Sequence, residues 1–259
     1  MKKLTILALG LALLLPTGLK AQDSEMFNHL GLGFSLGTDG IGFEAAMPIG
    51  QYVQARTGVS FMPAFSYSDK VKLYTTTDLA TGAEYDNKVK AKGKLNMTDW
   101  KLLFDIYPSK KSAFHFTVGF YLGKENVVKA KNTEIDDDGI LRNGGAILIG
   151  GQPFGANTEG IANIHVRANS FKPYLGIGFG RAVPREHRVA VTCDLGVQFW
   201  GKPKVYAYND DILHGGMKEV RYQDIDRDSS ASDCRKAIKI INGIFVWPVI
   251  NIRINGRIF

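Results

Sequence analysis

Six charged residues of this 259-residue chain stand at alternate positions of stretches that are otherwise rich in apolar and small residues. They are Glu44, Arg56, Lys101, Asp105, Asp194 and Arg253. Three are acids and three are bases, and an unpaired charge in an enclosed space is strongly destabilising. The pattern therefore predicts that the six side chains form a network of ion pairs.

The other residues that could do chemistry form no catalytic or metal-binding motif. The histidines His29, His115, His165, His187 and His214 show no spacing typical of a hydrolase or a metal site. The acidic run 134–139 begins like a calcium loop, but its twelfth position is Gly145 where such a loop carries Glu. We therefore expect no catalytic residue, no metal and no cofactor.

The segments that must position the six charges alternate large apolar residues with small or polar ones. In 114–123, the even positions are large and apolar and the odd positions are small, polar or amphipathic. Comparable stretches give predicted strands at about 29–37, 41–47, 52–62, 95–107, 113–123, 172–182, 188–200 and 246–259. Such strands fit a soluble sandwich or a barrel surrounded by lipid.

The connections between these stretches alternate between short and long. The connections at 48–51, 108–112 and 183–187 are short, whereas three others run to tens of residues. Outer-membrane barrels have this alternation, with short periplasmic turns and long extracellular loops. The sequence thus predicts an all-β fold, an eight-stranded antiparallel transmembrane β-barrel with long extracellular loops.

Two of the long connections contain local patterns. Ala237, Ile238 and Ile241 in 229–243, with Ile244 directly after it, recur at helical spacing, and Ser232 or Asp233 is suited to cap a short loop helix. The apolar run 143–151 lies between glycine pairs and is expected either to pack as a hairpin edge or to contact a ligand.

The N-terminus has the layout of a secretory signal peptide. Lys2 and Lys3 precede the apolar run 4–15, and the small residue Ala21 offers a cleavage site. We expect residues 1–21 to be the signal and 22–259 to form one barrel domain. After residue 21 no apolar stretch approaches the length of a membrane helix, so any membrane span must consist of strands.

The C-terminus resembles a known group. The stretch 233–259 ends on Arg257-Ile258-Phe259 and is similar to the C-terminal end of the small Bacteroidetes outer-membrane barrels, a porin-like group of the outer membrane protein A and X type. The resemblance implies the outer membrane of a Gram-negative bacterium as the location. It also implies that Phe259 is part of the signal read by the barrel assembly machinery.

The chain carries a formal charge of +7, to which Lys2, Lys3 and Lys20 contribute, and it has no compact basic-aromatic motif for nucleic acid. We expect a non-enzymatic barrel with a plugged lumen, whose partners are outer-membrane lipid and an extracellular protein or glycan ligand bound by surface loops. Two alternatives remain at this point, a channel for small solutes or hydrophobic compounds and a lipid-modifying enzyme.

Overall fold

The computed structural model describes residues 28–74, 88–135, 139–143, 145–149, 151–185, 187–209, 216–223, 225 and 232–258. The expected signal peptide 1–21 and the terminal residue Phe259 lie outside these residues, as do residues 136–138 of the acidic run 134–139.

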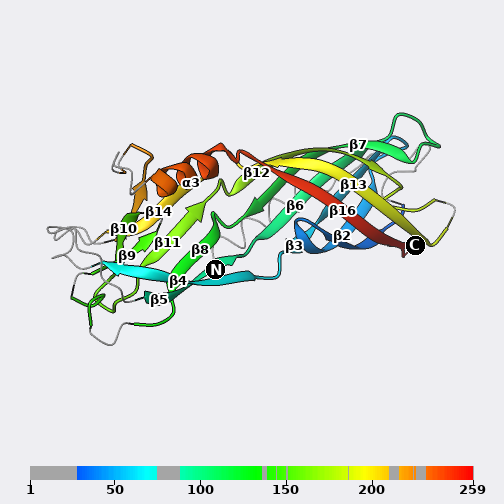
Figure 1. The fold of residues 1–259 in the computed structure, drawn as a ribbon. Helices are drawn as coiled ribbons and strands as arrows, with labels where there is room; N and C mark the ends of the chain where they lie inside the picture. The colour runs from blue at the N-terminus through cyan, green and yellow to red at the C-terminus, as the bar shows by residue number, and fades with distance from the viewer. Residues whose placement is uncertain are drawn as a thin grey trace, which may run out of the picture.

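Eight antiparallel strands form a closed barrel, at the right of Figure 1. They are β1 (Gly31–Gly37), β2 (Gly40–Pro48), β3 (Val53–Phe61), β6 (Thr98–Ile106), β7 (Phe114–Gly123), β12 (Phe171–Phe179), β13 (Val189–Phe199) and β16 (Val246–Arg257). The order around the barrel is β1-β16-β13-β12-β7-β6-β3-β2, so the first and last strands pair and close it. The predicted fold class is confirmed, and each predicted barrel strand is present with its ends shifted by a few residues.

The barrel wall has an apolar outer face and a polar inner face. Large apolar side chains at alternate positions are exposed on the outside, as Leu32, Phe34 and Leu36 of β1 illustrate. The intervening positions of the other strands carry buried polar groups, including Gln198 and Asn251. This arrangement reverses that of a soluble protein and suits a wall that meets lipid on its outside.

The long connections are not simply loops, which corrects the sequence prediction. They fold into a second eight-stranded antiparallel sheet, here called the outer sheet, with the order β10-β9-β4-β5-β8-β11-β14-β15. Its strands are β4 (Phe65–Tyr74), β5 (Lys88–Leu95), β8 (Asn126–Asn132), β9 (Ala146–Ile149), β10 (Gln152–Gly155), β11 (Asn163–Arg167), β14 (Lys204–Asn209) and β15 (Gly216–Val220). Figure 1 shows this sheet at the end of the molecule opposite the C-terminus.

The outer sheet extends the barrel wall. Five of its neighbouring strands, β4, β5, β8, β11 and β14, continue β3, β6, β7, β12 and β13 in the same order. Backbone hydrogen bonds carry the ladder across the junction, from Met62 N to Met97 O (2.8 Å) and from Asn96 N to Val127 O (3.0 Å). The backbone ladder of the barrel therefore continues into the outer sheet, and the two sheets form one wall. They differ in the kinds of side chain on its two faces.

The outer sheet has its own apolar core. Leu73, Val89, Ile147, Phe154 and Val205 are buried on its inner face. The helix α3 (Ser232–Gly243) adds Cys234 and Ile238 to this core, so the predicted helix is present and packs on the outer sheet. The run around Ile147 forms the β9–β10 hairpin, and its packing interpretation is confirmed.

The turn between β1 and β2 contains the pair Asp39-Gly40, which is typical of tight hairpin turns. Gly40 has a φ of 98°, which favours glycine. Among the described residues, no helix is long and apolar enough to cross a membrane. The cysteines Cys193 and Cys234 are free; Cys193 is exposed on β13, and Cys234 is buried on the face of α3 that packs on the outer sheet.

Candidate functional site

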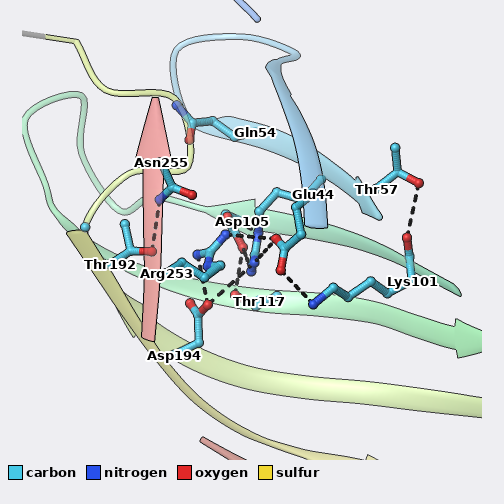
Figure 2. Close-up of polar contacts among 12 residues, drawn as sticks. Glu44, Gln54, Thr57, Lys101, Asp105, Thr117, Thr192, Asp194, Arg253 and Asn255 are labelled. Carbon is cyan, nitrogen blue, oxygen red and sulfur yellow. Dashed lines mark hydrogen bonds and ion pairs between the residues drawn. The ribbon is translucent and has the colours of Figure 1, made fainter. Parts of the chain in front are cut away.

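The six predicted charged residues all lie inside the barrel and are in contact. Glu44 comes from β2, Arg56 from β3, Lys101 and Asp105 from β6, Asp194 from β13 and Arg253 from β16. Each is at most 5% exposed. They face the interior because lipid-facing positions of the same strands are apolar, so the alternation leaves only inward positions for charges. Figure 2 shows the charged groups of Glu44, Lys101, Asp105, Asp194 and Arg253 pointing toward one another from different strands.

Arg56 is the centre of the network. Its Nε lies 2.7 Å from Asp105 Oδ2, and its Nη2 donates to Asp105 Oδ1 at 2.7 Å, which makes a two-point contact. Its Nη1 lies 3.0 Å from Glu44 Oε2 and 3.5 Å from Asp194 Oδ2. Guanidinium groups suit this role because they are planar and stay charged. One arginine thus bridges three carboxylates.

Arg253 and Lys101 complete the pairing. Arg253 contacts Glu44 through Nη1 (3.1 Å) and Asp194 through Nη2 (2.8 Å). Lys101 Nζ lies 2.6 Å from Glu44 Oε1. Each of the three acids in the predicted set therefore contacts at least one cation, and Glu44 contacts all three.

The structure adds charged residues that the sequence analysis did not select. Asp39 lies 3.6 Å from Lys101, and Lys172 Nζ donates to Asp99 Oδ1 at 2.7 Å. Asp99 and Lys172 occupy positions of β6 and β12 that alternate in step with the other inward-facing residues. Strand alternation in the sequence is therefore sufficient to place both side chains in the lumen. Asp39 belongs to the β1–β2 turn, where strand parity gives no information.

Polar and aromatic layers close both sides of the ionic layer. Near the short turns, the Tyr107 hydroxyl donates to Gln54 Oε1 at 3.0 Å, and the Val183 amide donates to the same oxygen at 3.1 Å. Toward the outer sheet, Tyr121 and Tyr174 pack edge to face with ring centroids 5.5 Å apart. Buried side chains thus lie on both sides of the ionic layer.

Among the described histidines, His115 is the one that contacts the charged network. Its Nε2 lies 3.1 Å from Asp194 Oδ1 and 3.8 Å from Asp105 Oδ1, and Thr117 donates to Asp105 at 2.8 Å. His29 and His187 lie near the short-turn end and His165 lies on β11, whereas His214 is outside the described residues. The described histidines are therefore scattered, and the part of the chain that the structure describes shows no group of three metal-ligating side chains.

The fold and the site define the class of protein. A closed antiparallel barrel with an apolar outer face, a polar lumen and short turns at one end is the architecture of an outer-membrane β-barrel.

The chain has a distant likeness to several solved structures. The chain is similar to CarO of Acinetobacter baumannii, with 16% identity and a TM-score of 0.46 over 87% of this chain and 96% of that one. For CarO2 of the same organism the values are 19% and 0.47, over 88% and 98%. A major outer membrane protein of Thermus thermophilus shows 13% and 0.33, over 88% and 98%. No protein-family model and no curated protein matches the chain.

Proposed function

We propose that the protein is a non-conducting, non-enzymatic outer-membrane anchor that holds the outer sheet at the cell surface, where it binds an extracellular protein or glycan. The observation that carries this proposal is the filled lumen. The three ion-paired carboxylates Glu44, Asp105 and Asp194 are buried and lie between two further layers of side chains, which supports a closed lumen.

The energetics of the network favour a permanent plug. Opening a passage would separate Arg56 or Arg253 from carboxylates, and separating a buried pair without replacing the partner is costly. The network also spans five strands, so no single mobile element carries the charges away together. These features support a structural role for the six residues and count against the channel alternative.

The geometry of the described residues supports a non-enzymatic role. A lipid-modifying enzyme needs a nucleophile, a base and an orienting carboxylate within hydrogen-bond reach near the outer rim. The contact of His115 with Asp194 joins a base to a carboxylate, but it is fully enclosed near the opposite end. Lipid analysis by mass spectrometry with and without the protein tests this part, and an altered lipid would overturn it.

Conductance in planar bilayers tests the anchor proposal directly. Folded, full-length protein is added after its heat-modifiable migration on a denaturing gel has been verified, because a misfolded sample would also fail to conduct. We expect no steady conductance from the protein, and a boiled sample gives the background. A large, stable single-channel conductance would overturn the proposal.

The biogenesis signals are part of the same proposal. We infer that residues 1–21 are cleaved as a secretory signal and that Phe259 helps the assembly machinery recognise the last strand, as in the Bacteroidetes barrels that the C-terminal stretch 233–259 resembles. N-terminal sequencing of the membrane-extracted protein should begin at Gln22. Deleting Phe259 should lower the amount of heat-modifiable protein in the outer membrane, and an unchanged amount would refute this role.

A further inference from the structure

The outer sheet carries a strongly cationic surface on its outward face. Two neighbouring strands, β5 and β8, supply a set of exposed lysines that we call the lysine face: Lys88, Lys90, Lys92, Lys94, Lys129 and Lys131. Within the described residues, the positions of β4, β5 and β8 that share this face hold no carboxylate; they hold lysines and the serines Ser66 and Ser68. Glu125 and Glu134 lie beyond the two ends of β8. The lysine face therefore has no acidic side chain at its own positions on these strands.

The lysines are placed where they repel one another. Lys92 lies directly opposite Lys131 and Lys94 directly opposite Lys129 in the β5–β8 ladder. On the other side of β5, Lys90 lies opposite Lys70. Like charges directly opposite in an antiparallel pair destabilise a sheet. A surface with such repeated pairs is stabilised when an external anion lies across them.

The lysine face continues the lipid-facing wall of the barrel. From β5 to β6 the parity never breaks, so the odd positions from Val89 to Asp105 face inward and the even positions face outward. Read along the chain, the outward residues are Lys88, Lys90, Lys92, Lys94, Asn96, Thr98, Trp100, Leu102, Phe104 and Ile106. The outward residues thus change from lysines to an amide, then to an aromatic residue and then to apolar residues. This order is expected where a barrel wall crosses from a layer of anionic groups into the hydrocarbon of the membrane.

The heights along this wall identify the kind of anion. Trp100 is a residue of the type that marks the membrane–water interface. Lys94 lies six residues away, about 20 Å along the strand, or roughly 15 Å along the membrane normal at the usual tilt of about 40°. Phospholipid headgroups extend only about 5–8 Å beyond the hydrocarbon. The lysine face therefore stands at the level of an extended anionic headgroup, such as a phosphorylated oligosaccharide.

A pocket adjoins the lysine face nearer to the membrane. Its volume is about 440 Å³, and Arg167, Lys202 and Lys204 contribute cations to it. The Arg167 guanidinium stacks over the Tyr206 ring at 4.2 Å, and its Nε donates to Asn126 Oδ1 at 3.1 Å, so its position is fixed. Glu125 also lines the pocket, and Lys204 contacts Glu219 at 3.0 Å.

A histidine next to this pocket responds to the positive charge. Burial, followed by the charges of Lys129 and Arg167, lowers the pKa of His165 below its ordinary value. The lysine face and the pocket thus act on the same neighbouring side chain, which indicates one continuous positive region.

We propose that the lysine face binds the phosphate and carboxylate groups of an outer-leaflet glycolipid in the membrane that surrounds the barrel. Several lysines contact one headgroup, with Arg167 and Lys202 meeting the anionic groups nearest to the acyl chains. This inference rests on the barrel's placement in an outer membrane but not on its closed lumen, so conductance of the barrel would leave it standing.

Glycolipid binding by the full-length folded protein in detergent micelles tests the proposal. The probe is rough-type lipopolysaccharide, and the variant is Lys90→Gln/Lys92→Gln/Lys94→Gln/Lys129→Gln. We expect the affinity to fall by at least about thirtyfold, because each lysine near an anionic surface contributes several-fold. The matched control, Lys110→Gln/Lys111→Gln/Lys236→Gln/Lys239→Gln, removes the same charge from other exposed sites and should bind within about twofold of the unchanged protein.

Further measurements keep the outcomes distinct. Heat-modifiable migration verifies folding of each variant, and Lys92→Gln/Lys131→Gln is the substitute if the fourfold variant does not fold. Replacing the same four lysines by arginine should retain binding. Equal loss in the matched control would overturn the proposal. So would equally tight binding to phosphatidylglycerol vesicles without glycolipid, or to single-stranded DNA, because the site would then not select an extended glycolipid headgroup.

Discussion

The barrel and the outer sheet share one wall but reverse the chemistry of its two faces. In β6 the outward residues include Leu102 and Phe104 and the inward ones include Lys101 and Asp105. In β5, which leads directly into β6 with the same parity, the outward residues are lysines and Val89 is buried inside. Inner and outer positions thus exchange composition within a few residues.

The difference teaches that the surroundings of the wall decide what its interior contains. Where lipid lies outside, apolar side chains are stabilised there, and the lumen is left to polar groups that must pair with one another. Where water lies outside, the apolar residues are stabilised on the inner face, as in any soluble sheet. The barrel therefore depends on specific contacts inside, whereas the outer sheet depends on buried apolar area.

The largest expected effect comes from breaking the ionic interior of the barrel. Arg56→Met leaves Glu44, Asp105 and Asp194 without their shared partner, and we expect a loss of about 3–5 kcal/mol in the free energy of unfolding. Urea unfolding in detergent micelles measures it. The control Lys204→Met removes one side of the exposed pair with Glu219 and should cost at most about 1 kcal/mol. Similar costs for both variants would contradict the proposed dependence on buried pairing.

The outer sheet should unfold independently of the barrel when its apolar core is weakened. Ile147 is 1% exposed, and Ile147→Ala should cost about 2–5 kcal/mol in local stability. We expect faster hydrogen exchange in 88–95 and 204–209, while heat-modifiable migration of the barrel stays unchanged. Ile135→Ala, at an exposed position, is the control. Loss of the barrel's heat resistance in Ile147→Ala would show that the two regions unfold together.

Glycine substitutions compare how tightly the two regions are packed. A Cβ at Gly58 in the barrel would meet the Phe43 carbonyl oxygen and lie 2.8 Å from Glu44 Cα, so Gly58→Ala should cost about 1–3 kcal/mol. At Gly93 in β5 the nearest atom would be Tyr67 O at 3.9 Å. Gly93→Ala should therefore be neutral or slightly stabilising. Thermal unfolding of the two variants measures the difference in stability. Equal effects of Gly58→Ala and Gly93→Ala would contradict the expected difference in packing.

The smallest expected effect concerns pH. The pKa of His165 lies below its ordinary value of 6.5 in the folded protein, so the unfolded chain binds more protons as the pH falls through 6.5. The outer sheet should lose a little stability between about pH 7.5 and 5, measured by hydrogen exchange corrected for the intrinsic rate. His165→Gln should remove the part of this pH dependence that is due to His165. An identical dependence in the variant would exclude this histidine as its source.

Strand parity explains why the sequence predicted the barrel so well. Lipid on the outside demands apolar residues at every second position, and this signal marks all eight barrel strands and the inward place of Arg56 and its partners. The sequence prediction does not include the outer sheet, because it identifies strands by an apolar outer face, and the outer sheet has a polar outer face. The segment Lys88-Val89-Lys90-Ala91-Lys92-Gly93-Lys94-Leu95 has the same period of two with the polar face outward. The prediction therefore places its lysines in a long connection.

Contacts between distant strands are the part that local patterns do not give. Parity places Glu44 and Arg253 on the inner face, but their contact depends on the pairing of β1 with β16 and on how far each strand is shifted. The placement of Asp39 against Lys101 likewise depends on the height of a turn above the ionic layer.

The contact between Arg253 and Glu44 joins residues 209 positions apart in the chain. Arg253 belongs to β16, the strand that closes the barrel by pairing with β1. A barrel in which β16 had not paired would leave Glu44 and Asp194 short of one cation. Closure of the wall and charge balance inside it therefore depend on the same strand.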